Sequence, residues 1–275
     1  MGLGLLMLLV IFPAKKSRGQ DIYDYKHSLV YGKFLINTRQ FNLATEEFER
    51  LIFMNPFNDT IKQQLVHAYL MGQQYQTLIL RTNTLYTNPV EFPQSVALDY
   101  SRAMVMNETP FRLEDFLKQN HNLLQDEKLF LKLNSQLLSY QWDEAEETYD
   151  SLVSGGNASH LKYDALFRGI HDAKFKKAGI ALGMSAIMPG SGKAYTGEWK
   201  DGLVALFFVA GSAIQAYRGY NLYGKKSTFF IAYTGLAASF YLGNLYGSFK
   251  SARKHNDKIR KQLHSHMADT FAGTF

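Results

Sequence analysis

Two long runs without charge in the last third of the chain constrain its fold more than any other feature. Residues 202–223 form a run of 22, of which the first sixteen carry no charged side chain, and residues 227–249 carry none over 23. As helices these runs reach about 33 and 35 Å, against a membrane hydrocarbon core of about 30 Å. Both are therefore predicted to cross a membrane, antiparallel, because only the short polar turn 224–226 joins them.

Small residues recur on one side of the second run. Gly235 and Ser239 lie four positions apart, and so do Gly243 and Gly247. Small residues at this spacing share one helix face and let another helix approach closely, so we predict helix packing at these four positions. The alternative interpretation, a hairpin buried in a soluble domain, would need 23 uncharged residues in one soluble helix.

A shorter apolar segment, 178–188, reaches only about 17 Å as a helix and cannot cross a membrane alone. It can lie in the membrane interface, or it can enter the membrane and return. It can also be extended by the preceding Phe175, Lys176 and Lys177, with the lysines reaching back to the surface. The sequence leaves these three alternatives open. The turn after it is predicted to reverse the chain at the membrane surface, because a proline ends the helix, glycines permit the reversal, and lysine and tyrosine settle at headgroup depth. Its residues are Pro189, Gly190, Gly192, Lys193, Tyr195 and Gly197.

The same turn does not match a phosphate-binding loop. That pattern needs a glycine where Ile187 stands and a serine or threonine where Ala194 stands. The chain has no cysteine, and its eight histidines have no carboxylate partners at ligand spacing. We therefore expect no cofactor, no metal site and no enzyme activity.

Charge divides the chain. Residues 21–150 hold 18 acidic and 11 basic side chains, whereas residues 151–275 hold 16 basic and 6 acidic ones. Because apolar runs interrupt the basic half, we predict that it contacts anionic phospholipid rather than nucleic acid. The residues expected at the lipid headgroups are Lys250, Arg253, Lys254, Lys258, Arg260 and Lys261.

The acidic half repeats with a period of about 34 residues, which is the length of one tetratricopeptide repeat, a helix–turn–helix unit. Phe41 and Tyr75 stand one period apart, and Tyr75 and Trp142 stand two periods apart, while the pattern is weak between 93 and 120. The resemblance to this repeat extends over residues 22–154. It implies a solenoid whose groove binds a protein partner, or else a spacer that only folds. Helices are expected at 27–38, 43–54, 60–71, 74–86 and 143–153.

Residues 1–20 contain a short apolar run, 2–12, followed by Ser17 and Gly19, which suit cleavage by a signal peptidase. We predict a cleaved export signal, although the basic residues follow the run; the alternative is an uncleaved anchor. Export would place the repeats in the periplasm, with the chain held in the inner membrane. Two spans would then leave the C-terminus outside, whereas three would leave it in the cytoplasm, where the positive-inside rule favours the basic tail.

The hairpin itself resembles an uncharacterised family of bacterial envelope proteins. The likeness lies in Pro189-Gly190-x-Gly192-Lys193-x-Tyr195-x-Gly197 and in Tyr241-x-Gly243-Asn244-x-Tyr246-Gly247, and it continues to Ala252 and Asn256. Members of that family carry such a hairpin, often behind an export signal and helical repeats. The resemblance implies a membrane protein of unknown activity, common in Bacteroidetes-like bacteria and sometimes fused to membrane-protein insertion factors.

These features predict an all-α protein made of a helical repeat solenoid followed by a transmembrane hairpin. The expected parts are a signal peptide (1–20), a repeat domain (21–154), a linker (155–177), a hairpin domain (178–249) and a basic tail (250–275). The expected function is that of a non-enzymatic, membrane-anchored scaffold or adaptor of the cell envelope. The alternative is an accessory factor in membrane-protein insertion or envelope transport that acts through the hairpin.

Overall fold

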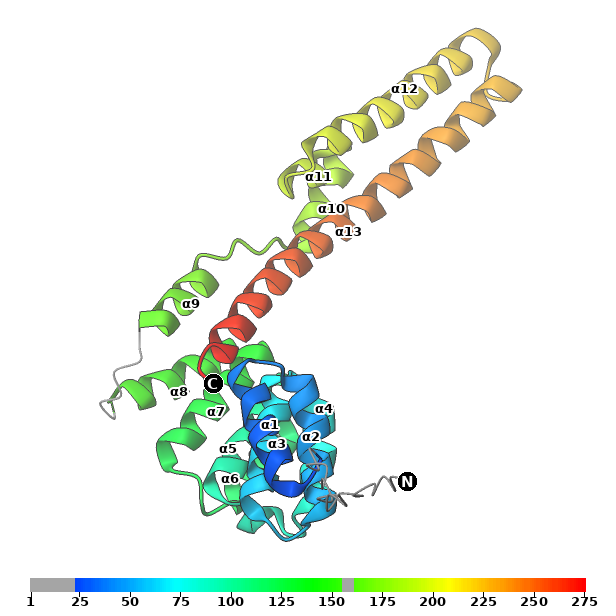
Figure 1. Ribbon diagram of the computed structural model, residues 1–275. Helices are drawn as coiled ribbons and strands as arrows, with labels where there is room; N and C mark the ends of the chain where they lie inside the picture. Colours follow the sequence, from blue (N-terminus) through cyan, green and yellow to red (C-terminus); the bar gives the residue numbers. More distant parts are fainter. Residues whose placement is uncertain (1–22, 155–160) are drawn as a thin grey trace, which may run out of the picture. The chain divides into compact units, whose positions relative to one another are not determined.

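The computed structural model describes residues 23–154 and 161–275, in which every regular element is a helix (Figure 1). The expected all-α class is confirmed for this part of the chain. The predicted signal peptide and the start of the predicted linker lie outside the described residues. Contacts divide the chain into two units: a first unit up to residue 103 together with 119–122, and a second unit of 104–118 and 123–275.

The acidic half is built from consecutive helix–turn–helix pairs. A short 3-10 helix, η1 (Pro89–Glu91), lies between the second pair and the third. The third pair falls in the region where the sequence pattern is weak. The pairs are α1 (Tyr25–Asn37) with α2 (Phe41–Met54), α3 (Asp59–Met71) with α4 (Tyr75–Leu85), α5 (Gln94–Met106) with α6 (Pro110–Gln119), and α7 (Gln125–Leu138) with α8 (Trp142–Ser154).

The turn inside each pair has the same backbone conformation. One residue per turn adopts a left-handed conformation, with φ between 52° and 61°, at Arg39, Gln73, Glu108 and Tyr140. The N–H of the next residue donates to the carbonyl five positions earlier, as in Gln40 to Leu35 (2.8 Å) and Gln74 to Tyr69 (2.9 Å). This bond closes the first helix and reverses the chain into the second. The four left-handed residues are almost evenly spaced along the chain, so the turn recurs with the period of the sequence.

In the first unit, side chains one period apart pair with each other. Asn42 accepts from Gln74 at 2.9 Å, and Glu49 accepts two bonds from Arg81 at 2.7 Å. His67 and Asp99 make the same kind of contact at 3.0 Å, and this hydrogen bond raises the pKa of His67. Each of these pairs is separated by 32 residues in sequence. Successive helix pairs of this unit therefore pack in one fixed register.

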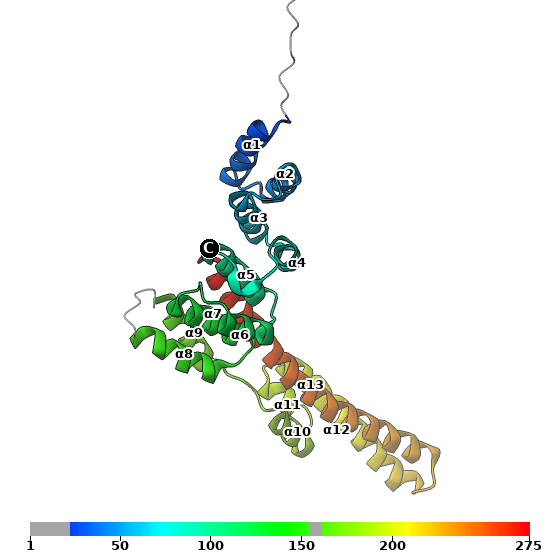
Figure 2. The same ribbon diagram turned by 90° about the horizontal axis from the view of Figure 1, so that it is seen from below.

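The hairpin occupies the second unit and consists of α10 (Ala178–Ile187), α11 (Ser191–Tyr195), α12 (Trp199–Tyr223) and the start of α13 (Thr228–Ala272). Figures 1 and 2 both show α12 running beside the first half of α13. Gly224, with φ of 80°, ends α12, and the Ser227 hydroxyl accepts from the Phe230 N–H at the start of α13. The sequence predicted two spans. Among the described residues, α12 alone is long and apolar enough to cross a membrane, and 227–249 form part of the longer α13.

The residues of the predicted basic tail continue the second helix of the hairpin. Residues 250–272 belong to α13, a single helix of 45 residues, because no glycine or proline interrupts it between Gly247 and Gly273. Its end packs on α7 and on α9 (Leu161–His171). Phe271 is fully buried, with its ring 5.9 Å from that of Phe130. The last turns of α13 are therefore part of the core of the second unit.

The repeated turn makes a prediction about stability. Gln73 is exposed and left-handed, whereas Gln76 is exposed inside α4. Gln76→Gly should destabilise the fold by about 1 kcal/mol, the usual cost of glycine in a helix. Gln73→Gly should not, because the left-handed conformation costs a non-glycine residue roughly 1–2 kcal/mol, which glycine avoids. Thermal unfolding followed by circular dichroism measures both, and a lower midpoint for Gln73→Gly than for Gln76→Gly would contradict the assignment of the turn.

Candidate functional site

The segment from Lys176 to Glu198 folds back against one face of α13. Lys176 bonds to Asn256, Ser185 to Ser248, and Gly190 to Asn244. The order of these contacts means that α10 runs antiparallel to α13, from its charged part toward its uncharged part. Thr196 then meets Ser251, so α11 returns in the opposite direction. Within the described residues, the segment therefore runs along α13 toward its uncharged part and then turns back.

Every backbone N–H in the turn from Met188 to Gly192 has an acceptor within the chain. Met188 donates to the Met184 carbonyl at 2.9 Å, and Ser191 donates to the Met188 carbonyl at 3.1 Å. Gly190 donates to Asn244 Oδ1 at 2.9 Å, and Gly192 donates to Ser185 Oγ at 2.9 Å. Pro189 has no N–H to satisfy. Each N–H of this irregular turn is therefore satisfied without water.

Two carbonyls before the turn are also bonded to α13. Asn244 Nδ2 donates to the Ser185 carbonyl at 3.4 Å, and the Tyr241 hydroxyl donates to the Ala186 carbonyl at 2.9 Å. Asn244 is 3% exposed, while Ser185 and Ser248 are fully buried and lie 2.6 Å apart. The residues of α13 that bind this segment recur every three or four positions, on one helix face. They are Tyr241, Asn244, Ser248 and Ser251, and His255 continues the series by contacting the Lys174 carbonyl just before the segment; the five are together called the polar seam.

An ion pair closes the charged end of the polar seam. Ser251 donates to Glu198 Oε2 at 2.7 Å, and Lys254 lies 3.3 Å from Glu198 Oε1. The hydrogen bond from Ser251, and then the contact with Lys254, lower the pKa of Glu198, which stands just before α12. Asn256 binds the Lys176 backbone twice, at 2.7 and 2.8 Å. These contacts fix the two ends of the folded-back segment to α13.

Glycines permit the close packing inside the hairpin. An added Cβ on Gly190, where φ is 90°, would lie 2.0 Å from the Gly202 carbonyl oxygen. The same addition at Gly202 would lie 2.5 Å from the Gly190 oxygen, and at Gly192 it would lie 1.9 Å from the Ala181 oxygen. Near the far end of the hairpin, a Cβ added to Gly219 would lie 2.6 Å from the Phe229 ring, so the glycine leaves room for that ring. Because the blocking atoms are mostly backbone, no larger residue fits without moving a helix.

The predicted packing positions are not the ones that pack inside the chain. Among the described residues, no atom lies within 4 Å of a Cβ added to Gly235 or Gly243, and Ser239 is exposed. Gly247 is the exception, since the Lys193 side chain lies 3.1 Å away from its added Cβ. Contact of this face with another molecule stays a prediction, whereas helix contact within the chain uses Gly190, Gly192, Gly202 and Gly219.

The other predicted turn residues have separate roles. Lys193 lays its aliphatic stem over Gly247 and is partly buried, rather than extending freely from the turn. Tyr195 presents its ring to the Lys176 ammonium, 4.5 Å away. Gly197 has φ of 90° and provides the reversal from α11 into α12, with open space around its Cα.

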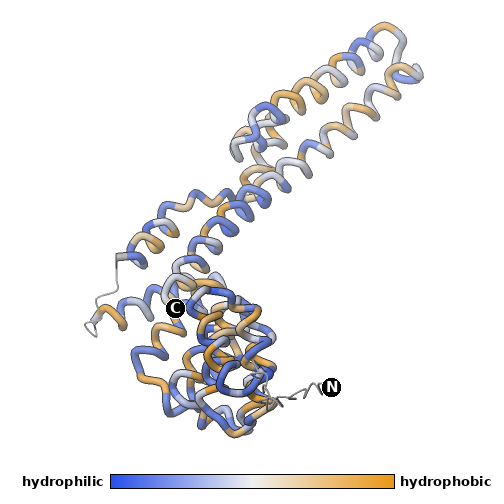
Figure 3. Tube along the Cα trace, viewed as in Figure 1, coloured by the Kyte–Doolittle hydropathy of each residue, from blue (hydrophilic) through white to orange (hydrophobic). Residues whose placement is uncertain are grey.

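The six cations predicted at the lipid headgroups all lie exposed along the middle of α13. In Figure 3 the colour of α13 changes from hydrophobic to hydrophilic along the helix, and the cations begin where the apolar stretch ends. Lys254 contacts Glu198, and Arg253 lies 4.4 Å from the centre of the Phe249 ring. Arg260 lies close to Asp257. Lys250, Lys258 and Lys261 are exposed to the surroundings of α13.

The uncharged helices carry many exposed apolar side chains. Only 28% of the apolar window of α12 is buried, although a core helix of a soluble protein would be mostly buried. Exposure reaches 75% at Phe207, 64% at Leu242 and 90% at Ile187 of α10. Figure 3 shows hydrophobic residues recurring along α12 and the first half of α13. Water is a poor solvent for so continuous an apolar surface.

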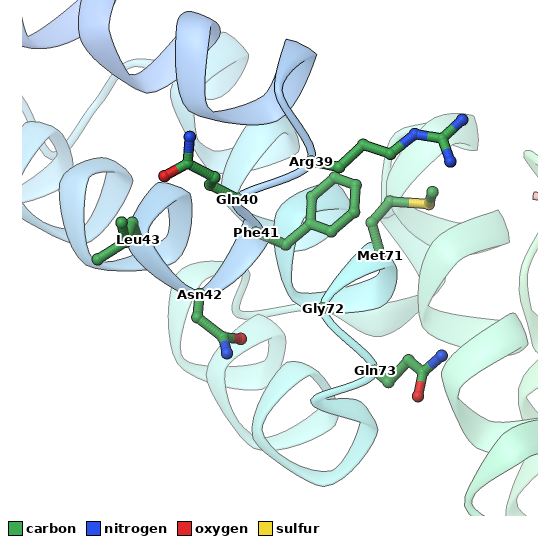
Figure 4. Close-up of a pocket in the computed structure, with 8 residues that line it drawn as sticks. All are labelled: Arg39, Gln40, Phe41, Asn42, Leu43, Met71, Gly72 and Gln73. Carbon is green, nitrogen blue, oxygen red and sulfur yellow. The ribbon is translucent and has the colours of Figure 1, made fainter.

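A pocket of about 440 Å³ opens in the first unit beside the α1–α2 and α3–α4 turns (Figure 4). Its lining includes Arg39, Phe41, Met71 and Gln73. Arg39 is the one charged residue among those that line it, so the pocket offers no acid–base pair for catalysis. Across the described ranges, 23–154 and 161–275, no three residues of metal-ligating type gather.

The comparisons with known proteins found no relationship. No protein-family model matches the sequence, and no curated protein or solved structure matches it either. A function for this chain must therefore be inferred from its own residues and contacts.

The close packing of α12 on the turn predicts a sharp difference between two glycines of one helix. Gly202→Ala should disrupt the hairpin, because its methyl group would overlap the Gly190 carbonyl. Gly211→Ala should be tolerated or slightly stabilising, because no atom lies within 4 Å and alanine favours helix by about 1 kcal/mol. Thermal unfolding in detergent and the amount of protein recovered from membranes measure both. Equal behaviour of the two variants would show that Gly202 does not contact the turn.

Proposed function

We propose that this protein is a non-enzymatic, membrane-anchored scaffold or adaptor of the cell envelope, which binds a protein partner through its helical pairs. The observation that carries the proposal is the hairpin, whose outside is apolar while the backbone N–H groups of its turn are satisfied from within. A membrane interior requires this combination, because it offers apolar side chains a good solvent and offers backbone groups no hydrogen bonds.

Two further features support insertion into a bilayer. The uncharged part of the hairpin is flanked by cations, with Lys225 and Lys226 at the tip and Lys250 onward at the base. Trp199 is 56% exposed at the start of α12, and Tyr223 is 66% exposed at its end. Aromatic side chains of this kind favour the two membrane interfaces. Both runs, 202–223 and 227–249, are proposed as the membrane spans, in the inner membrane and in contact with anionic phospholipid.

The acidic half is proposed to be a tetratricopeptide-like solenoid. Its support is the recurrence of one turn at Arg39, Gln73, Glu108 and Tyr140, and the pairing of side chains 32 residues apart in the first unit. Repeat arrays of this type commonly bind peptides or proteins on an extended surface.

The first unit exposes aromatic side chains that its own core does not use. Phe53 is 87% exposed and Phe57 is 90% exposed, beside the connection from α2 to α3. On α1, Tyr31 and Phe34 are about half exposed, with their rings stacked 6.5 Å apart. Aromatic side chains are enriched at protein interfaces, so these four are the proposed contact residues for the partner.

The second candidate function is that of an accessory factor in membrane-protein insertion or envelope transport. The observation that favours it is the face of α13 with Gly235, Ser239 and Gly243, which is exposed and where the glycines contact nothing inside the described chain. Such a face suits close approach by a second membrane helix.

Insertion of the hairpin can be tested with lysine substitutions. Phe207 and Ile214 are 75% and 60% exposed on α12. In a soluble hairpin lysine would be harmless at these positions, whereas in a bilayer each lysine costs about 2.5–3.5 kcal/mol on insertion scales. Phe207→Lys with Ile214→Lys should therefore sharply reduce the protein retained in membranes after alkaline carbonate extraction.

The matched control is Phe53→Lys with Phe57→Lys, at still more exposed positions outside the hairpin. This control should leave retention unchanged. Release of the unmodified protein by carbonate, or equal retention of both double variants, would exclude the membrane hairpin.

Partner binding can be tested by site-specific photo-crosslinking in membranes of the native host. A photoreactive residue in place of Phe34 or Phe57 should give a discrete adduct with one protein. The same residue in place of the exposed Gln76 of α4 should not. If position 34, position 57 and position 76 all give the same pattern, or none gives an adduct, the adaptor role is wrong. An adduct that forms only from Gly243 would favour the second candidate.

A further inference from the structure

Contacts between residues far apart in the sequence bring the charged ends of the hairpin segments together. Lys176 and Lys177 precede α10, whereas Lys250 comes much later in the chain, in α13. The two hydrogen bonds between Asn256 and the Lys176 backbone place the start of α10 beside the charged part of α13. The entry of α10, the start of α12 and the exit of α13 therefore lie at one end of the hairpin, here called the base.

The segment α10–α11 reaches into the uncharged zone from the base and returns to it. Its turn meets α13 at Asn244, which lies six positions before Lys250 and thus about 9 Å along the helix. Outside this contact, α10 presents apolar side chains, with Ile180 at 47% exposure and Ile187 at 90%. Irregular backbone is tolerated at such depth only where protein covers its polar groups, as Asn244 and Ser185 do here.

The end of α13 and the helices that precede the hairpin belong on the same side of the membrane. Phe271 and Met267 are buried in the second unit, where α13 packs on α7 and α9. No described helix before α10 is long and apolar enough to cross a membrane, and the gap 155–160 is far shorter than the roughly 20 residues required. From residue 23 onward the chain thus leaves and returns to one side, through α12 and the proposed span 227–249.

Charge then selects that side. The tip of the hairpin carries Arg218, Lys225 and Lys226. The base carries many more cations, and the side with the excess of lysine and arginine near the spans stays in the cytoplasm. The cations of the base are Lys174, Lys176, Lys177, Lys193, Lys200, Lys250, Arg253, Lys254, Lys258, Arg260 and Lys261.

We infer that the chain from residue 23 onward crosses the membrane twice, that α10–α11 is a re-entrant segment in the leaflet on the base side, and that the helical pairs and the C-terminus both face the cytoplasm. The inference rests on the proposed membrane hairpin. It replaces the periplasmic location expected from residues 1–20, because the buried end of α13 keeps α7 and α9 on the base side and the cations of the base favour the cytoplasm.

The absence of cysteine from the sequence makes the test direct. Single-cysteine variants of the full chain, Gln76→Cys, Thr274→Cys, Lys225→Cys and Ile187→Cys, are expressed in bacteria. Sealed right-side-out and inside-out membrane vesicles are then treated with a membrane-impermeant maleimide. Gln76→Cys and Thr274→Cys should label only in inside-out vesicles, and Lys225→Cys only in right-side-out vesicles. Ile187→Cys should label in neither until detergent is added, because a thiol in lipid does not ionise.

The other outcomes separate the inference from the proposed function. Labelling of Gln76→Cys and Thr274→Cys only in right-side-out vesicles, with Lys225→Cys reversed, would keep the hairpin and overturn the orientation. Labelling of Gln76→Cys and Thr274→Cys from opposite sides would overturn the two crossings. Labelling of Ile187→Cys as readily as Thr274→Cys would overturn the re-entrant segment. Labelling of Lys225→Cys and Thr274→Cys from the same side would show that the hairpin does not span, and the proposed function would fail with it.

Discussion

The hairpin depends on one amide side chain. Asn244 accepts from the Gly190 N–H and donates to the Ser185 carbonyl, so it binds the chain on both sides of the reversal. In apolar surroundings each of these backbone groups would cost several kcal/mol if left unpaired. This buried asparagine therefore holds the end of α10 and the following turn together against α13, beside the bonds from Ser248 and Tyr241. No hydrophobic residue of the same size could do this, because it would leave both backbone groups unsatisfied.

The position of α12 follows from that of the turn. Gly190 and Gly202 touch through backbone atoms, which is possible because neither has a side chain. Gly190 can take its left-handed conformation only as glycine or at a steric cost. Its placement by Asn244 therefore sets where the first turn of α12 can lie. The pairing of α12 with α13 then continues to Gly219 and Phe229, near the tip.

The sequence predicted both helices of the first two pairs and the second helix of the fourth, but no helix of the third, and the reason for the third is local. Two positions after the left-handed residue, the other pairs start their second helix with Phe41, Tyr75 or Trp142. The third pair has Pro110 at that position instead, and proline also suits the first turn of a helix. The aromatic period is thus interrupted while the turn is kept. The continuation of α13 past the hairpin was hidden for a related reason: charge at Lys250 ends the apolar stretch, but it does not end a helix.

The site was harder to predict because its contacts join residues 54 to 80 positions apart. Glycine spacing on α13 pointed to a face whose glycines, apart from Gly247, meet nothing within the described chain, whereas the contact face is marked by small polar residues three and four apart in an uncharged helix. That pattern was visible in the sequence at Asn244, Ser248 and Ser251.

The contacts of this face also affect how firmly the hairpin is attached to the rest of the second unit. Because α13 is one helix from the polar seam to the buried Phe271, and Asn256 ties the preceding linker to it, the hairpin is joined to α7 and α9 by two connections instead of one flexible segment.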